Sequence, residues 1–481
     1  MKRTLILALV AAFMLASVPA MAAHWIGSGG EGLGFEAAGS WRVSGNWMDN
    51  MDFADSSTDG ENEDEFDVKQ RARTYFTFQA NENLKGVLKT EIGDWRWGND
   101  AGEVSGDAVA IEVKNAYLDV TLPNTSLNLK AGLQGLALPA AFGGSPVFDD
   151  DVNALVANYG VNDMFSVTAG WARLYDQNIG EADDDAANND EFDMAFLAAP
   201  ITMDGANITP YGAYAWIGSD VFTQGNFAEE GRFTGMWSGV SNAPTYGALI
   251  GGAGQIGSSL AGVEIEDITA YWIGLPVEVN AFDPIAVKAD FHYGKMTVEN
   301  SAEDIDMSGY LFDLAVDYKM DFATPRVFFS YSNGVDEDDL EDGDISVFPT
   351  VSGFWAADTM LFDNSVFGQD LGIYQPLSMW TVGARLMGMS FIDKLSHDLG
   401  ITYAKGTTDN ETGLSFGNSG LLNDEESLMA IDFTNNYQIY ENLAAVAEFG
   451  YAKYDMDDNN DATDDETDSA YKMAVGMKYD F

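Results

Sequence analysis

Cationic side chains recur at alternate positions of one segment, as on one face of a β-strand. Lys69, Arg71 and Arg73 stand two residues apart, and successive side chains of a strand point to opposite faces of the sheet. The three cations therefore share one face. Such a row can bind or steer anionic groups, or it can brace a neighbouring segment through ion pairs. The sequence leaves both interpretations open.

The segment that could face this row is a loop of unusual composition. Residues 137–152 are rich in apolar and small side chains. Pro139 and Pro146 cannot donate to a strand ladder, and Gly143 and Gly144 permit sharp turns. Because an apolar loop needs cover, we predict that it folds into the interior of a wide barrel and narrows it. The alternative is an ordinary packed loop.

Three consecutive carboxylates close this loop and supply charge opposite to that of the cationic row. We predict a constriction with a basic and an acidic side. The basic side comprises Lys69, Arg71, Arg73 and Lys130, and the acidic side comprises Asp149, Asp150 and Asp151. Under the alternative interpretation, the same residues form ion pairs that brace the loop.

The elements that would position these residues are strands. Segments of about ten residues with period-two hydrophobicity recur through residues 23–481, as in 471–481, and they alternate with turns and acidic loops. This pattern predicts an all-β transmembrane antiparallel barrel of about 18 strands, with 16 as the alternative. A cation on the lipid face near the bilayer midplane costs about 2–4 kcal/mol, so the basic row must face the lumen. Arg42, Lys89, Glu91 and Lys114 are further expected lumen residues. A soluble array of β-sandwiches is the competing fold.

Composition limits the functional classes. The chain carries 77 acidic and 23 basic residues, a net charge of −54, which excludes a nucleic-acid binder that relies on non-specific attraction to phosphates. Its 46% hydrophobic content argues against disorder. It contains no cysteine, so thiol catalysis and disulfides are impossible.

The first residues predict export. Lys2 and Arg3 precede a short apolar run, and Ala20-Met21-Ala22 fits a cleavage site. We expect residues 1–22 to be a signal peptide. The run is too short for a spanning helix.

Two long loops and one acidic loop complete the expectations. We predict external loops at 218–266 and 335–377. No cofactor is required, although the acidic loops could hold Ca²⁺ or other divalent cations. Asp455, Asp457, Asn459 and Glu466 have a spacing similar to that of an EF-hand loop, but Asn460 replaces the required glycine. The alternatives are a solvated loop, or divalent ions that bridge this loop to lipopolysaccharide phosphates.

Several of these features resemble a known family. The terminal Phe481 resembles the end of the closing strand of outer-membrane barrels. Phe142-Gly143-Gly144 and Asp149-Asp150, in a loop after the fifth strand, resemble the constriction loop of bacterial trimeric general porins. The resemblance implies a homotrimer in the outer membrane of a Gram-negative type bacterium, in contact with lipid and lipopolysaccharide, with one pore in each subunit.

The same resemblance implies a passive, water-filled channel for small hydrophilic solutes and ions, in which a transverse field orients the solute. We expect a weak preference for cations, because acidic external loops concentrate them. A substrate-selective channel for organic acids or sugars and a surface-structural acidic barrel are the alternatives. With 3 histidines and no paired nucleophile and base, the sequence does not favour an enzyme.

Overall fold

The computed structural model describes most of the chain. The described residues are 24–25, 34–51, 53, 65–98, 109–176, 191–218, 265–300, 304–342, 344–362, 364–368, 371–373, 375–416, 420–455 and 469–481. The expected signal peptide at 1–22 lies outside them, as does nearly all of the expected external loop at 218–266.

The described residues form one antiparallel sheet with little helix. The strands of the first half are β1 His24–Trp25, β2 Gly34–Asp49, β3 Glu65–Asn81, β4 Leu84–Arg96, β5 Glu112–Thr121, β6 Leu127–Ala137, β7 Asp149–Gly160, β8 Ser166–Tyr175, β9 Phe192–Ala198, β10 Ile201–Met203, β11 Ala206–Ile208 and β12 Tyr211–Ile217. Those of the second half are β13 Ile265–Gly274, β14 Val277–Phe282, β15 Ile285–Asn300, β16 Ile305–Tyr318, β17 Thr324–Ser332, β18 Asp344–Ile345, β19 Met379–Ile392, β20 Leu395–Gly406, β21 Ser427–Tyr440, β22 Leu443–Asp455 and β23 Ala470–Asp480. The helical elements are α6 Glu337–Asp342 and η3 Asn410–Thr412. None of the described helices is long and apolar enough to cross a membrane.

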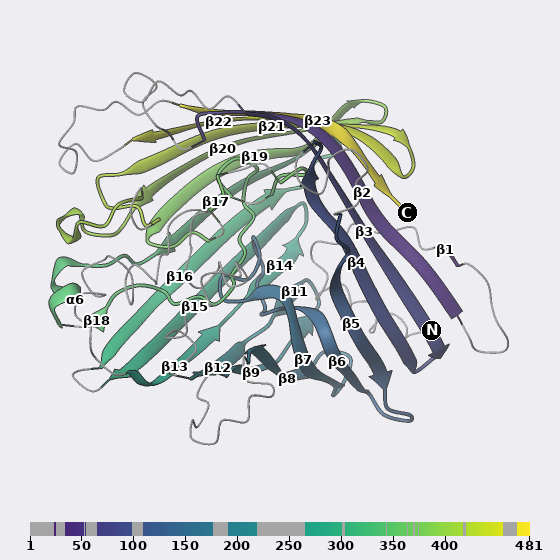
Figure 1. The fold of residues 1–481 in the computed structure, drawn as a ribbon, viewed down its shortest axis with the longest axis horizontal. Helices are drawn as coiled ribbons and strands as arrows, with labels where there is room; N and C mark the ends of the chain where they lie inside the picture. Colours follow the sequence, from purple (N-terminus) through teal and green to yellow (C-terminus); the bar gives the residue numbers. More distant parts are fainter. Residues whose placement is uncertain are drawn as a thin grey trace.

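The sheet closes on itself because its first long strand pairs with its last. β2 lies between β23 and β3 (Figure 1), with Trp41 in register with Tyr479 and with Ala72. Gly39 and Phe481 exchange two backbone hydrogen bonds at the seam. The pairs β9/β10, β11/β12 and β13/β14 are each two pieces of one spanning strand, and β1 and β18 are short additions. In the described part of the chain the barrel therefore has 18 strands, which confirms the first of the two predicted numbers.

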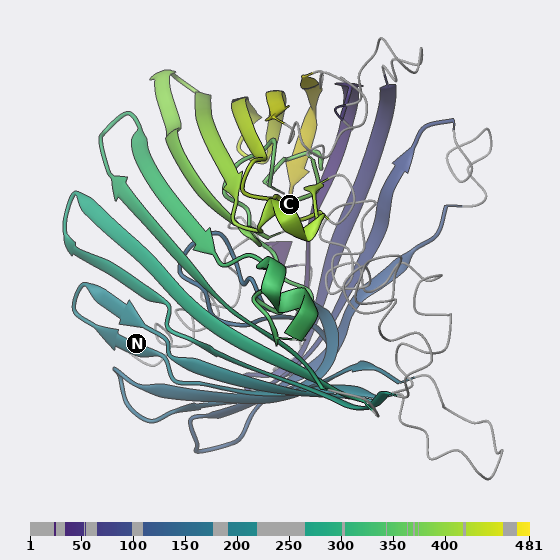
Figure 2. The same ribbon diagram turned by 90° about the vertical axis from the view of Figure 1, so that its left-hand side faces the viewer.

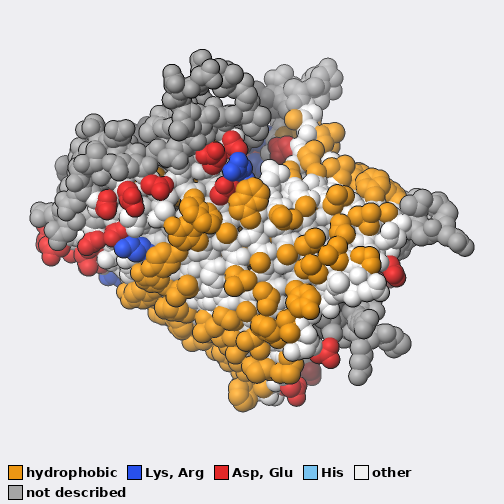
Figure 3. Space-filling model, turned by 90° about the horizontal axis from the view of Figure 1, so that it is seen from below, with side chains coloured by type: hydrophobic (Ala, Val, Ile, Leu, Met, Phe, Trp, Pro, Cys, Tyr) orange, Lys and Arg blue, Asp and Glu red, His pale blue; other side chains and the backbone are white. Residues whose placement is uncertain are grey.

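The outer face of the barrel is apolar. Side chains that alternate along the strands, such as Trp41, Leu155, Val327 and Ile401, are largely exposed. Figure 3 shows such hydrophobic side chains spread across one outer face, with charged ones gathered toward an edge. A closed barrel leaves no unpaired strand edge, and an apolar outside matches a lipid environment. The protein is a bacterial outer-membrane β-barrel.

The two rims differ in the length of their connections. Short turns follow β3, β5, β7 and most other strands that end on the rim where β2 begins and β23 ends. At the opposite rim the strand ends are separated by more residues of sequence, and α6 lies there; Figure 2 looks toward that mouth. In bacterial barrels short turns are periplasmic and long loops external. This assigns the rim of α6 to the outside of the cell.

The loop predicted at 335–377 begins at the external rim with α6, and many of its described residues from 344 onward are buried against the inner face of the barrel. Trp355, Met360 and Phe362 are fully buried. The segment contacts inward-facing side chains far apart on the sheet: Trp272 Nε1 on β13 donates to the Pro349 carbonyl at 2.7 Å, and Thr359 donates to Asp432 on β21 at 3.0 Å. The physical reason is composition, because these apolar side chains need cover that solvent cannot give.

The inward segments fill one side of the lumen and leave the other partly open. The inner-face residues of β9 and β12 are all buried, as are Leu311, Asp313 and Ala315 of β16. By contrast, inner-face residues of β3, such as Arg71, Arg73 and Tyr75, keep intermediate exposure. Among the described residues, the solvent-accessible lumen therefore runs along the wall formed by β3 to β5.

Candidate pore constriction

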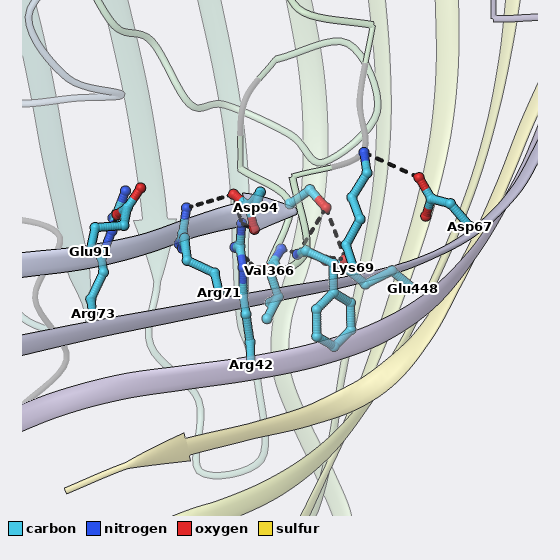
Figure 4. Close-up of polar contacts among 11 residues, drawn as sticks. Arg42, Asp67, Lys69, Arg71, Arg73, Glu91, Asp94, Val366 and Glu448 are labelled. Atoms are coloured by element: carbon cyan, nitrogen blue, oxygen red, sulfur yellow. Dashed lines mark hydrogen bonds and ion pairs between the residues drawn. The ribbon is translucent and has the colours of Figure 1, made fainter. Parts of the chain in front are cut away.

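The predicted basic row lies on this open wall. Lys69, Arg71 and Arg73 alternate along β3, and register places Arg42 of β2 opposite Arg71. All four side chains are directed into the barrel, as Figure 4 shows. Like charges directly opposite on neighbouring strands destabilise a sheet, so nearby carboxylates must compensate them.

The compensating carboxylates come mainly from the adjacent strand β4. Arg73 Nε pairs with Glu91, its register partner. Lys69 Nζ lies 3.4 Å from Asp67 of its own strand. Asp94 accepts from Arg42 Nη2 at 2.8 and 3.0 Å, and from Arg71 Nη1 at 3.2 Å. One carboxylate thus serves two guanidinium groups, which leaves this point of the wall with an excess positive charge.

Arg42 has a second partner, the backbone of the inward segment. Its Nη1 donates to the Val366 carbonyl. The Val366 N–H donates to Glu448 of β22 at 2.8 Å, and Ser365 Oγ donates to the same carboxylate at 2.9 Å. Figure 4 shows Val366 between the two side chains. Two strands of the barrel wall therefore hold the inward segment through the backbone N–H and carbonyl of Val366.

The inward loop predicted after the fifth strand is present, with narrower bounds. β6 ends at Ala137 and β7 begins at Asp149, so the loop is 138–148, and Phe142 and Val147 within it are buried. The Asp290 carboxylate of β15 accepts the N–H groups of Ala141 at 2.7 Å and Phe142 at 2.8 Å. This contact anchors the loop across the lumen from its own strands.

The loop and the second inward segment form one unit. Val351 N donates to the Val147 carbonyl at 2.9 Å, Phe354 N to Ser145 at 2.8 Å, and Ala356 N to Gly143 at 2.9 Å. Trp355 packs edge-on against Phe142, with ring centroids 5.7 Å apart. The constriction is therefore composite, built from 138–148 and from the described residues of 344–377.

The predicted acidic side differs from the arrangement found. Asp149, Asp150 and Asp151 are the first residues of β7 rather than the end of the loop, and period two sends them to alternate faces. Asp150 accepts from Ser352 Oγ at 2.9 Å, and Asp151 accepts from Asn115 Nδ2 at 2.7 Å. Among the described residues no hydrogen bond or ion pair joins the three aspartates to the row on β3.

Lys130 also lies apart from the basic row. It is in register with Asp119 of β5, which is in register with Lys85 of β4, which in turn is in register with Gln79 of β3. Gln79 lies closer to the periplasmic turn than Arg73 does, so Lys130 is on the periplasmic side of the basic row. Its Nζ lies 5.8 Å from the Tyr117 ring centroid. Higher on the same wall, Lys89 Nζ lies 5.2 Å from the Tyr75 ring centroid. The periplasmic half of the wall is thus lined by amines beside phenol rings.

The EF-hand-like spacing has one member in the described part of the chain. Asp455 is the exposed last residue of β22, and Asp457, Asn459 and Glu466 lie outside the described residues. Within the described ranges no group of three or more His, Asp or Glu side chains could hold a metal ion. Divalent-ion binding at the acidic loops stays a prediction.

Sequence reasoning missed the anchors of the inward segments. Asp94, Asp290 and Glu448 carry the contacts described above, and only Glu91 of the compensating carboxylates was an expected lumen residue. A single carboxylate within an apolar or small-residue stretch of a strand, as Glu448 is in residues 443–452, is a signal that could have identified them.

Comparison with known proteins supports the fold. No protein-family model matches the chain, and no curated protein matches it in sequence. Among solved structures, OccAB3 of Acinetobacter baumannii is 11% identical, with 92% of this chain and 99% of that chain covered and a TM-score of 0.52. OccAB1 of the same organism is 10% identical, with coverage of 92% and 97% and a TM-score of 0.50. OmpT of Vibrio cholerae is 13% identical, with coverage of 95% and 100% and a TM-score of 0.41. At these identities the likeness concerns the fold, which is that of outer-membrane β-barrel channels.

Proposed function

We propose that this protein is a passive outer-membrane channel through which small hydrophilic solutes and ions diffuse along the wall formed by β3 to β5. One observation carries the proposal. The lumen faces of β9 and β12 are sealed by apolar side chains, whereas the charged face of β3 stays accessible. Selectivity then depends on the bore left by the inward segments and on the charge of the wall.

A second candidate is a channel that prefers organic acids. The specific observation is the shared carboxylate Asp94, which offsets only part of the charge of Arg42 and Arg71. Lys89 and Lys130, lower on the wall, add positive charge without an ion pair among the described residues. This local charge opposes the cation preference that the overall charge of −54 predicts.

Three further expectations belong to the proposal. The channel works as a homotrimer, it contacts lipopolysaccharide at its external rim, and its acidic loops take divalent cations there. Each rests on the sequence resemblance or on the acidic composition. Cross-linking of the protein in outer membranes, with trimer bands as the expected result, tests the first of them.

Planar-bilayer recording tests the proposed function. Purified full-length protein that shows heat-modifiable migration, and is therefore folded, should insert with stepwise conductance in KCl. Reversal potentials under a salt gradient give the ion preference. Saturable block by one organic acid would favour the second candidate. Absence of conductance from folded protein would overturn the channel proposal and leave a surface-structural barrel.

A further inference from the structure

The five residues around the Arg42 contact, 364–368, form a segment that lies against the inner face of β22, β23 and β2 and that we call the strap. Glu448 holds the N–H groups of Val366 and Phe367, at 2.8 and 3.3 Å. The Phe367 ring is buried in a small cluster with Ala444, Val446 and Ala474. These contacts fix the strap to β22 and β23 without any help from Arg42.

The second attachment of the strap is the hydrogen bond from Arg42. Arg42 offers charged N–H donors, and its strap partner is a neutral carbonyl. A carboxylate can accept two parallel N–H bonds from one guanidinium, and such bidentate pairs are frequent for arginine. A carboxylate would therefore be a better partner for this guanidinium than the Val366 carbonyl is.

The local charge favours such an exchange. Asp94 is shared by Arg42 and Arg71, and register places Lys478 of β23 on the other side of Arg42. Lys478 has its own partner, Asp480, at 3.3 Å. The position opposite Arg42 can therefore accept one more anion, and the Val366 carbonyl occupies it.

The strap also borders a cavity. Val366 lines this cavity of about 260 Å³, which extends past Thr434 and Asn436 to the periplasmic turn at Glu441 and Asn442. Thr434 Oγ1 and Asn436 Oδ1, both in the cavity lining, have no hydrogen-bond partner within the described residues. A displaced strap would open this polar cavity to the basic wall.

We propose that Arg42 is the specificity-determining residue of the constriction, and that the carboxylate of a small organic anion opens the strap by replacing the Val366 carbonyl on its guanidinium. Glu448 and Phe367 keep the displaced strap attached, so that it returns when the anion leaves. This inference rests on the proposed channel function and names the chemistry of its selective solute.

Accessibility of Val366 tests the exchange directly. The chain has no cysteine, so a Val366→Cys protein carries a single thiol, and its reaction with N-ethylmaleimide is measured by mass spectrometry. Succinate should accelerate labelling by about fivefold or more over its neutral analogue succinamide, within the usual range of coupling between sites. Equal rates with the two solutes would overturn the inference.

Two variants in this background separate the Arg42 contact from general loosening. Arg42→Gln should give fast labelling that no longer responds to succinate. Gly368→Ala keeps every charge, but Gly368 has a φ of 68° and its added Cβ would lie 3.3 Å from Arg42 Nη2, so it should also raise basal labelling. Lys319→Gln, which removes one cation near a periplasmic turn, is the matched control and should keep the succinate response. Arg42→Gln protein that still responds to succinate would contradict the role of Arg42.

Bilayer recording separates this inference from the proposed function. The wild-type protein should conduct KCl. With succinate it should open for longer and to a higher conductance level than with succinamide. Arg42→Gln protein should stay at one conductance level with either solute. Conductance that is indifferent to succinate overturns only the strap exchange. Absence of any conductance overturns the channel itself.

Discussion

Arg42 and Glu448 bind the two polar backbone groups of the same residue, Val366, from strands that flank β23. The wall that carries the basic row is therefore next to the strands that hold the inward segment in place. Substitutions on this wall fall into two classes. We expect those at Arg42 and Glu448 to change the bore together with the charge, whereas those at Arg71 and Arg73, whose ion pairs are with Asp94 and Glu91, should change mainly the charge.

Removal of two cations from β3 should shift ion preference. In Arg71→Gln/Arg73→Gln protein the carboxylates of Asp94 and Glu91 lose partners, so the local potential becomes more negative. We expect the reversal potential under a KCl gradient to move toward cations. Lys319→Gln/Lys394→Gln removes the same charge at periplasmic turns and should have a smaller effect. An unchanged reversal potential in the β3 variant would place the basic row outside the ion path.

The Asp290 anchor should contribute to stability. In Asp290→Ala protein, the buried Phe142 N–H loses its acceptor, and an unsatisfied buried donor costs about 1–3 kcal/mol. We expect a lower urea midpoint in detergent and noisier open-channel current. Asp290→Asn keeps one acceptor oxygen and should lose less. Equal midpoints for the alanine variant and the wild type would mean that loop 138–148 is held by its contacts with 351–356 alone.

The inner and outer faces of the strands could be predicted from sequence. Side chains alternate between the two faces with a period of two, and the face toward lipid is mainly apolar. The alternation at 471–481 and at Lys69, Arg71 and Arg73 was sufficient to identify the outer and inner faces. Pro139 and Gly143 likewise marked the first inward loop. These are local signals, and neighbouring residues alone decide them.

The composite constriction could not be predicted, because its contacts join residues that lie far apart in the chain. Loop 138–148 pairs with 351–356 and is anchored by Asp290, and these segments meet only in the closed barrel. The apolar run around Trp355 carried a usable signal, because an external loop gains nothing from buried aromatic rings. The acidic run at 149–151 was predicted to close the loop because of its charge, but β7 begins there.

Gly143 should tolerate no side chain. Its φ is 78°, and an added Cβ would lie 2.4 Å from Trp355 Cδ1. Gly143→Ala then combines backbone strain with overpacking, the second of which costs about 1–3 kcal/mol. Gly413→Ala is the matched control, because Gly413 has a φ of 71° and no atom within 4 Å of its added Cβ. The difference between the two variants in thermal midpoint in detergent isolates the contact with Trp355. Equal losses would mean that the two inward segments separate easily at this point.

Asp358, on the second inward segment, should make stability depend on pH. Burial raises the pKa of its carboxyl, and the nearby Asp432 raises it further, against the opposing effect of Arg385. The folded protein therefore holds this proton more tightly than the unfolded chain does. The resulting stabilisation is complete below the unfolded pKa, about 3.9 for an aspartate, and is lost as pH rises through the folded pKa.

Asp358→Asn should remove this dependence while it keeps the local fold, because an amide oxygen can still accept the N–H groups of Met360 and Leu361, at 2.8 and 2.7 Å in the wild type. We expect the variant to gain stability relative to the wild type as pH rises from about 4 to about 8, near the ordinary range of carboxyl and histidine titration. Urea midpoints of the two proteins in the same detergent, taken across that range, measure the gain. Curves that run parallel would show that Asp358 carries the same proton in the folded and unfolded states, in which case its burial would have no electrostatic cost.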